Sequence, residues 1–278
     1  MVRRPLGNHH HGPDTLLVTS KTTTDTTTGT ATAPAAGTAT APATGTDERL
    51  QAVLRRARVV LWDFDGPICR LFAQHRAERV AAGLVQWLAR RGLHGLLDDT
   101  ERSAADPHLV LRAVDRRRRG SDLVTELEER LTEEELRAAA SALPTAFADP
   151  LIRTWTAVGS RLAVTTNNSP RAVRAYLDSR GLTACFAPHI YGRTAEVRRL
   201  KPDPYCLTRA LDAMGAAAPS ALMIGDSPSD LHAARRAGVP FLGYARDAEK
   251  ARPLLEAGAE HVVHSLEPLL LALRLRRP

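Results

Sequence analysis

The stretch that decides the fold runs from residue 58 to residue 66 and has the sequence Arg-Val-Val-Leu-Trp-Asp-Phe-Asp-Gly. Four consecutive apolar residues precede Asp63 and Asp65, and Gly66 is followed by Pro67. A short run of β-branched and aromatic residues that ends at Gly-Pro predicts a buried strand followed by a turn. Carboxylates at such a place are costly unless a metal ion or a reacting group uses their charge. Asp63 and Asp65 are therefore candidate functional residues.

The chain of 278 residues is long enough for one sizeable domain and a smaller one. It has no run of eighteen or more apolar residues, and no apolar stretch of signal-peptide length follows its first arginines. Its three cysteines are isolated in the sequence and form no paired motif, which fits a reducing compartment. We therefore expect a cytoplasmic protein without a membrane partner, and the sequence indicates no particular oligomeric state.

The formal net charge of +7 comes almost wholly from arginine, because lysine occurs only at Lys21, Lys201 and Lys250. A basic chain can bind nucleic acid or an anionic substrate. Here the positive charges are scattered and are not gathered with the stacking aromatic residues that single-stranded nucleic acid requires. We expect no nucleic-acid partner and attribute the basic composition to a general abundance of arginine.

Two segments differ in composition from the rest of the chain. Residues 1–47 are rich in Thr, Ala, Gly and Pro, which offer little to bury, and they predict a disordered tail. In residues 73–157, apolar side chains recur at helical spacing, and Thr132-Glu133-Glu134-Glu135 has the capping-box pattern that predicts a new helix starting there. This second segment is far longer than a simple crossover, so it predicts an inserted helical cap subdomain.

The remaining residues, 48–72 and 158–278, have the pattern of alternating strands and helices. Besides the opening strand, short apolar runs predict strands at 161–166, 189–192, 221–225, 240–245 and 261–263. Alternation of this kind is typical of right-handed βαβ units, with helices on both faces of a parallel sheet. The sequence therefore predicts an α/β fold with a Rossmann-like parallel sheet as its core.

Polar side chains of a particular kind follow these strands. They are Asp63, Asp65, Thr166, Asn167, Asp226 and Asp230, and Lys201 lies just before a predicted helix. The carboxyl ends of parallel strands converge on one edge of the sheet, so we expect these side chains to form one site. Several carboxylates in one cleft repel each other, and a divalent cation relieves that repulsion. Because the ligands would all be oxygen atoms, Mg²⁺ is the expected ion.

This set of side chains fits phosphoryl chemistry. An aspartate held against a phosphorus atom can act as the nucleophile and form an aspartyl-phosphate. A second aspartate two residues further along an extended strand points to the same side, where it can protonate the leaving oxygen and then activate water. Mg²⁺, Lys201 and the Thr166 hydroxyl would direct positive charge and hydrogen-bond donors at the phosphate oxygens.

With these residues in place, the chain resembles the haloacid dehalogenase (HAD) superfamily in its phosphatase branch. The resemblance covers roughly residues 57 to 265 and depends on four ordered motifs: Asp63-Phe64-Asp65-Gly66, Thr166-Asn167-Asn168, Lys201-Pro202-Asp203-Pro204 and Gly225-Asp226-Ser227-Pro228-Ser229-Asp230. It implies a HAD-like core with a helical cap between the first and second motifs. It also implies a phosphoric monoester hydrolase that acts on a small phosphorylated metabolite.

The resemblance further implies roles for the acidic residues. Asp63 would be the nucleophile and a ligand of Mg²⁺. Asp65 would be the general acid and base, and would bind the metal through its backbone carbonyl. Asp226 would be the third protein ligand, with Asp230 supporting it in part through metal-bound water.

The same resemblance assigns the residues that would contact the substrate. Thr166 and Lys201 would hold the transferring phosphoryl group, and Asn167 would offer its backbone N–H. Pro67 stands where phosphatases of this family often have Thr, so the resemblance is weakest beside the substrate mouth. Arg70, in that region, either binds a second anionic group of the substrate or is solvated.

Two alternatives to a phosphatase share much of this pattern. A sugar-phosphate mutase of the same superfamily has the same motifs and differs only in the group that attacks the intermediate. A non-catalytic HAD-like regulatory or binding protein would be free to lose an aspartate, whereas all four motifs are intact here. We therefore favour Mg²⁺-dependent hydrolysis of a phosphate monoester.

Overall fold

The computed structural model describes residues 51–274. The predicted disordered tail, 1–47, lies outside the described residues. A helical segment at 51–56 precedes the first strand. The strands of the main sheet are β1 (Val59–Trp62), β4 (Arg161–Thr165), β5 (Ile190–Tyr191), β6 (Ala221–Gly225), β7 (Phe241–Tyr244) and β8 (Val262–Val263).

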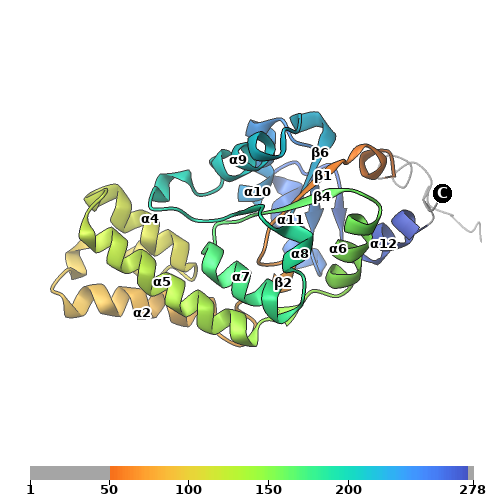
Figure 1. Cartoon of the computed structure of the whole chain (residues 1–278). Helices are drawn as coiled ribbons and strands as arrows, with labels where there is room; N and C mark the ends of the chain where they lie inside the picture. The colour runs from red at the N-terminus through yellow and green to blue at the C-terminus, as the bar shows by residue number, and fades with distance from the viewer. Residues whose placement is uncertain (1–50, 275–278) are drawn as a thin grey trace, which may run out of the picture. The chain divides into compact units, whose positions relative to one another are not determined.

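These strands form a six-stranded, all-parallel sheet in the order β5-β4-β1-β6-β7-β8. Figure 1 shows β4, β1 and β6 side by side within it. Strand β1 lies in the interior of the sheet, where Val60 pairs with Leu162 on one side and Leu222 on the other. Each residue of β1 is fully buried, as expected for a parallel strand covered on both faces. The predicted α/β fold is confirmed.

Helices cover both faces of the sheet. They are α6 (Ala148–Ala157), α7 (Pro170–Ser179), α8 (Thr183–Phe186), α9 (Tyr205–Met214), α10 (Pro228–Ala237), α11 (Ala248–Glu256) and α12 (Glu267–Arg274), with short 3₁₀ turns at Val197–Arg199 and Ala218–Ser220. Val60 and Trp62 point to the face covered by α6, α7 and α12. Val59 and Leu61 point to the opposite face, which α9 and α10 cover.

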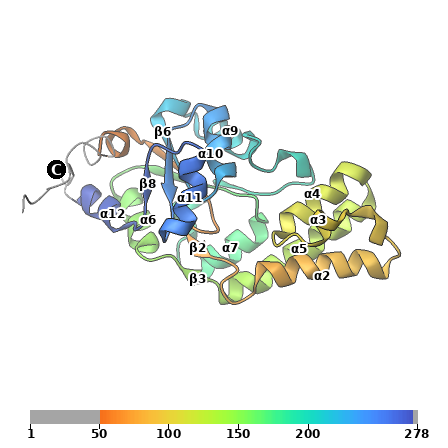
Figure 2. The same ribbon diagram turned by 180° about the vertical axis from the view of Figure 1, so that it is seen from behind.

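The helices between β1 and β4 form a separate group (Figure 2). They are α2 (Ala77–Arg90), α3 (Asp99–Arg102), α4 (Pro107–Arg118) and α5 (Asp122–Ser141), with a 3₁₀ turn at His94–Leu96. Buried side chains of α2, α4 and α5 form one apolar cluster, which we call the cap cluster. The chain leaves and re-enters the core through an antiparallel pair, β2 (Cys69–Arg70) with β3 (Leu143–Pro144).

One feature differs from the sequence expectations for this segment. A helix start at Thr132 is wrong, because α5 runs without interruption from Asp122 to Ser141. The capping-box pattern arises because Thr132 and Glu135, three residues apart, share the buried face of α5. In addition, Trp155 of α6 packs on the sheet and not in the cap cluster. The boundaries 48–72, 73–157 and 158–278 stay predictions.

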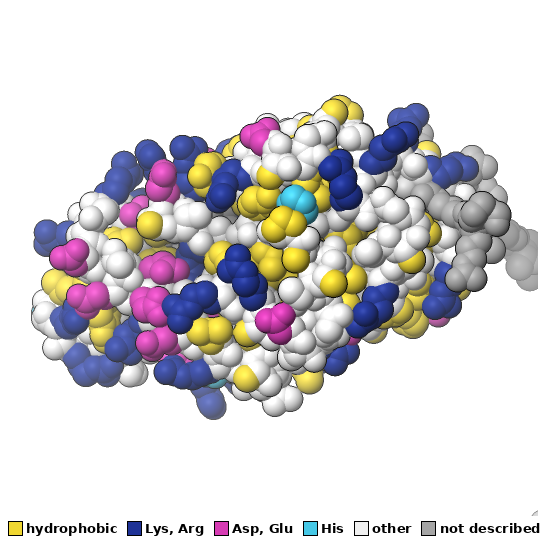
Figure 3. Space-filling view, in the orientation of Figure 1, with side chains coloured by type: hydrophobic (Ala, Val, Ile, Leu, Met, Phe, Trp, Pro, Cys, Tyr) yellow, Lys and Arg dark blue, Asp and Glu magenta, His cyan; other side chains and the backbone are white. Residues whose placement is uncertain are grey.

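The surface shows no concentration of one charge on the face seen in Figure 3. Lys and Arg side chains are spread over that face and alternate with acidic side chains over the cap helices. Among the described residues, none of the helices combines the length and the apolar character that crossing a bilayer requires. The absence of a nucleic-acid partner stays a prediction.

Trp155 should be a main source of stability for the layer that α6 forms on the sheet. Its ring meets that of Trp62 edge to face, with centroids 5.6 Å apart, and both side chains are fully buried. We expect Trp155→Ala to lower the free energy of unfolding by about 3–5 kcal/mol, because it leaves a cavity. The measurement is urea denaturation. Val158→Ala, at the exposed end of the same helix, is the control and should change stability by less than about 0.5 kcal/mol.

Candidate active site

The carboxyl edge of the sheet brings together aspartates from two interior strands. Asp63 directly follows β1, and its N–H donates to the Ile224 carbonyl of β6 at 2.8 Å. Asp226 directly follows β6, and Asp230 lies in the first turn of α10. Carboxylate oxygens of Asp63, Asp226 and Asp230 lie within 4.8 Å of one another. Adjacency of β1 and β6 in the sheet therefore produces a compact acidic cluster.

Lys201 is buried within this cluster. Its Nζ donates to Asp63 Oδ1 at 2.7 Å, to the Thr165 carbonyl at 2.9 Å and to Asp230 Oδ1. Burial lowers the pKa of Lys201, but the charges of Asp230 and Asp63 outweigh burial and raise the pKa above its ordinary value. All three ammonium hydrogens have acceptors, so the charge is held at one point between two carboxylates.

The aspartates carry more negative charge than Lys201 neutralises. Burial raises the pKa of Asp63 to about 6; repulsion by Asp230 adds to this, and Lys201 opposes it. Burial also raises the pKa of Asp226 well above its usual range, with further repulsion from Asp63 and Asp230. A divalent cation would relieve this repulsion, and a set of carboxylate oxygens at this spacing fits the oxygen preference of Mg²⁺.

Asp65 lies apart from the cluster, in the turn after β1. Its Oδ1 accepts a hydrogen bond from the Leu71 N–H at 2.7 Å, which fixes the side chain against the returning loop. Burial raises the pKa of Asp65 to about 7, although the Leu71 hydrogen bond acts in the opposite direction. Asp65 is thus oriented independently of Lys201.

Two glycines allow the acidic motifs to approach each other. Gly66 has a φ of +112°, and a Cβ built on it would lie 2.2 Å from Asp226 Oδ2. A Cβ on Gly225 would lie 2.4 Å from the Cβ of Asp230. A side chain at either position would push the carboxylates apart. Steric crowding therefore explains why the first and fourth motifs have glycine at these positions.

Asp230 combines a structural and an electrostatic task. Its Oδ2 accepts hydrogen bonds from Ser227 N at 3.0 Å and from Ser227 Oγ at 2.6 Å, which completes a capping box at the start of α10. Its Oδ1 accepts from Lys201. Because both oxygens of Asp230 have protein partners, Asp63 and Asp226 are the better candidates for direct metal ligands.

Thr166 and Asn167 follow β4 at the same edge. The Thr166 hydroxyl donates to Asn168 Oδ1 at 3.0 Å and accepts from the Asn168 N–H at 3.2 Å. Asn167 Oδ1 accepts from Lys201 N at 2.7 Å, and Asn167 Nδ2 donates to the Lys201 carbonyl at 3.3 Å. The Asn167 side chain therefore positions the segment that carries Lys201, a contact that the sequence did not predict.

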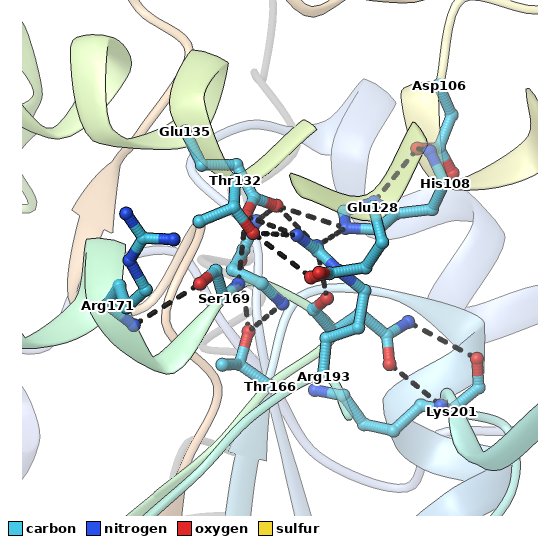
Figure 4. A network of polar contacts seen from close by, with 12 residues as sticks. Asp106, His108, Glu128, Thr132, Glu135, Thr166, Ser169, Arg171, Arg193 and Lys201 are labelled. Carbon is cyan, nitrogen blue, oxygen red and sulfur yellow. Dashed lines mark hydrogen bonds and ion pairs between the residues drawn. The ribbon is translucent and has the colours of Figure 1, made fainter. Parts of the chain in front are cut away.

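A buried network links this edge of the sheet to cap helix α5 (Figure 4). Arg193 follows β5, and its side chain is fully buried. It donates to both oxygens of Glu135, at 2.8 and 2.9 Å, and to Glu128 Oε1 and Thr132 Oγ1, each at 2.9 Å. It also donates to the Asn167 carbonyl at 3.1 Å. Arg193 thus joins α5 to the loop after β4.

Glu135 continues this network into the same loop. Its oxygens accept from Asn168 Nδ2 at 3.0 Å and from Ser169 N at 2.9 Å. Burial raises the pKa of Glu135, but the Arg193 charge and further hydrogen bonds outweigh it and lower the pKa to about 2. Through Asn168, Glu135 also holds the partner of the Thr166 hydroxyl.

His108 of α4 faces the same network. Its Nδ1 lies 3.1 Å from Asp106 Oδ1, and its Nε2 lies 3.3 Å from Glu135 Oε1 and 3.4 Å from Arg193 Nη1. Burial lowers the pKa of His108, but hydrogen bonds to Asp106 and Glu135 and the charges of these two carboxylates outweigh burial and raise it to about 9. We call Arg193, Glu135 and His108 the cap–core triad. Sequence reasoning missed it, because one arginine among so many gives no signal.

An open cleft of about 660 Å³ lies on another side of the site. Asp65 and Asp226 line it, together with Arg70, whose side chain is exposed. The structure therefore places Arg70 near the two acidic motifs, and its role in substrate binding stays a prediction. Thr166 and Lys201 are buried away from this cleft.

Comparisons with known proteins identify the family of the chain and structures of similar fold. Residues 57–238 match the family model for haloacid dehalogenase-like hydrolases. The phosphoglycolate phosphatase of Rhodospirillum rubrum is 41% identical over 114 residues, which are 40% of this chain and 46% of that protein. The enzyme of the same name from Thiobacillus denitrificans is 34% identical over 115 residues, 41% of this chain and 50% of that protein. The chain thus spans about half the length of these curated relatives.

Solved structures show a similar fold. CbbY from Rhodobacter sphaeroides, in complex with phosphate, has a TM-score of 0.56 and 22% identity, and covers 78% of this chain and 99% of its own. A haloacid dehalogenase-like protein from Agrobacterium tumefaciens has a TM-score of 0.52 and 21% identity, and the match covers 79% of this chain and 98% of that protein. At these identities the likeness concerns the fold alone.

The cap–core triad predicts that stability depends on pH. The pKa of His108 is about 9 in the folded protein, against an ordinary value of 6.5. Because the folded value is the higher one, the contribution of the protonated imidazole is fully present below pH 6.5 and is lost as the pH rises through 9. We expect the free energy of unfolding to fall by up to about 3 kcal/mol over this range, as measured by urea denaturation.

Two variants separate His108 from other titrating groups. His108→Gln should flatten the pH profile between 6.5 and 9, whereas His94→Gln, at an exposed site, should keep the wild-type slope. Equal slopes in the wild type and in His108→Gln would show that the imidazole is not linked to folding.

Proposed function

The chain belongs to the haloacid dehalogenase-like hydrolase family, and from that premise we propose that it hydrolyses a small phosphate monoester through an aspartyl-phosphate on Asp63. The observation that carries this proposal is the buried cluster in which Lys201 holds Asp63 beside Asp226 and Asp230. A nucleophilic carboxylate fixed beside further carboxylates and one ammonium suits a reaction that moves a phosphoryl group.

The reaction would proceed in two displacements. In the first, the Asp63 oxygen that is not bound to Lys201 attacks phosphorus, the P–O bond to the alcohol breaks, and Asp65 gives its proton to the leaving oxygen. In the second, Asp65 takes a proton from water, whose oxygen attacks phosphorus and releases inorganic phosphate and the Asp63 carboxylate. Lys201 would keep Asp63 in one orientation throughout, because its Nζ is bound on three sides.

We also propose Mg²⁺ as the cofactor. Asp63 and Asp226 would hold it, together with the backbone carbonyl of Asp65, and Asp230 would lie behind them. When bound, Mg²⁺ supplies positive charge that offsets the charge on the phosphoryl oxygens. The close spacing of the carboxylate oxygens and the raised pKa of Asp226 support a cation at this position.

The relatives support the class of substrate. Matched curated proteins carry the name phosphoglycolate phosphatase. A small phosphorylated metabolite in the cytoplasm is therefore the proposed substrate class.

Replacing the proposed nucleophile tests the reaction. We expect Asp63→Asn to reduce phosphate release from p-nitrophenyl phosphate by about 10³-fold or more, because the neutral amide cannot form the covalent intermediate. Asp212→Asn, on the exposed face of α9, is the matched control and should retain full turnover. Undiminished hydrolysis by Asp63→Asn would refute the assigned role.

Removing the metal tests the cofactor. We expect EDTA followed by desalting to abolish phosphate release, and added Mg²⁺ to restore it, because the carboxylate cluster lacks compensating charge without a cation. Circular dichroism before and after chelation controls for loss of fold. Full turnover by protein shown by elemental analysis to be metal-free would exclude Mg²⁺ from the reaction.

A further inference from the structure

The cleft beside Asp65 and Asp226 is rich in positive charge. Its cationic side chains come from three segments: Arg70 of β2, Arg76 just before α2, and Arg246 and Lys250 around the start of α11. Its volume of about 660 Å³ is that of a site for a small molecule. The cleft therefore has carboxylates of the proposed catalytic site in one part and cations in another.

These cations are poorly neutralised by the protein itself. Two of them form exposed ion pairs with sequence neighbours, Arg76 with Glu78 at 3.7 Å and Arg246 with Asp247 at 3.1 Å. Exposed pairs of this kind contribute little and are easily exchanged. Within residues 51–274, no carboxylate lies within ion-pair distance of Arg70 or Lys250. The cleft can therefore accept an anion without first breaking a strong internal contact.

Tyr244 shows that cations from different segments act on one place. This half-buried residue lines the same cleft. Burial raises the pKa of its hydroxyl, while the charges of Arg70 and Arg246 act to lower it. The two guanidinium groups come from separate parts of the chain, yet both influence the same hydroxyl. Asp226 acts on the hydroxyl in the opposite direction. Because Arg70, Arg246 and Tyr244 all line the cleft, positive charge from separate parts of the chain borders the same space.

Arg193 offers a useful contrast. It is the most deeply buried arginine near the site, and Glu128 and Glu135 already neutralise it. It holds the cap against the core and has no charge left for a ligand. The cations of the cleft, in comparison, are exposed and line an open space. Charge available to a substrate is thus found on the cleft side of the site.

We propose that this cleft binds a second anionic group of the substrate, so that the preferred substrates are small phosphate monoesters that also carry a carboxylate or a second phosphate. The proposal rests on the proposed phosphatase function. The phosphoryl group would lie at Asp63, Asp65 and Asp226, and the second anion would lie among Arg70, Arg246 and Lys250. Arg246 and Lys250 lie beyond residue 238, where the match to the family model ends.

The test compares kcat/KM for three esters of similar size in the presence of Mg²⁺: ethyl phosphate, phosphoglycolate and ethanediol bisphosphate. We expect the wild type to prefer the two esters with a second anion. Comparing phosphoglycolate with ethanediol bisphosphate then shows whether a carboxylate or a second phosphate is favoured. In Arg246→Gln and in Lys250→Gln, the preference over ethyl phosphate should fall about three- to tenfold. Arg252→Gln, exposed on the same helix but outside the cleft, should keep the wild-type preference.

Equal kcat/KM for the three esters in the wild type, or an unchanged preference in both cleft variants, overturns the proposal. If no ester and no p-nitrophenyl phosphate is hydrolysed, the proposed phosphatase function fails. Ester binding measured by calorimetry then tests the anion site of the cleft separately. Tighter binding of phosphoglycolate than of ethyl phosphate, lost in Lys250→Gln, supports the anion site. Equal binding of the two esters overturns it.

Discussion

The buried ammonium of Lys201 is the interaction on which the site depends. It lies between Asp63 and Asp230 and allows carboxylates from different strands to be buried close together. An isolated buried charge is very costly, whereas a charge with hydrogen bonds on every side is tolerated. The geometry of the acidic cluster therefore requires that the segment carrying Lys201 be placed accurately. Asn167 holds that segment through both backbone groups of Lys201, and Arg112 of cap helix α4 donates to the Lys201 carbonyl.

The surroundings of the cluster differ on its two sides. On one side, Arg193 and Glu135 of the cap–core triad are buried and paired with each other, and both contact the loop that carries Thr166 and Asn167. On the other side, the cleft is open and its cations are weakly paired. This division separates two tasks that need opposite properties. Positioning a reactive carboxylate requires buried and fixed contacts, while exchange of substrate and product requires an accessible surface with charges free to change partners.

Much of this arrangement could be predicted from the sequence. The buried strand ending at Asp63 and the alternation of strands and helices after residue 158 predicted the parallel sheet, and topology then placed Asp63 beside Asp226. These inferences succeeded because they depend on local hydrophobic patterns and on a general property of parallel sheets.

Other features could not be predicted, because they depend on how distant segments pack together. Thr132 and Glu135 matched a helix-start pattern, yet they lie inside α5 and face Arg193 of a different segment. The Asn167 side chain binds the backbone 34 residues away, a contact without a local signature. Its predicted role, a backbone N–H directed at phosphate, concerned a different group of the same residue.

Helix α5 has a consequence for how readily the cap could be exchanged with that of another protein. Its first half contributes Leu127 and Leu131 to the cap cluster. Its last turns contribute Ala138 and Ala139 to the apolar core on the face of the sheet that α6, α7 and α12 cover. Glu135 lies between these two parts and binds the core directly. A foreign cap that is joined at the β2–β3 pair and lacks counterparts of Glu128 and Glu135 would leave the buried Arg193 guanidinium without a carboxylate partner. The cap is therefore not a modular insert, and its sequence can diversify only around the residues that complete the core.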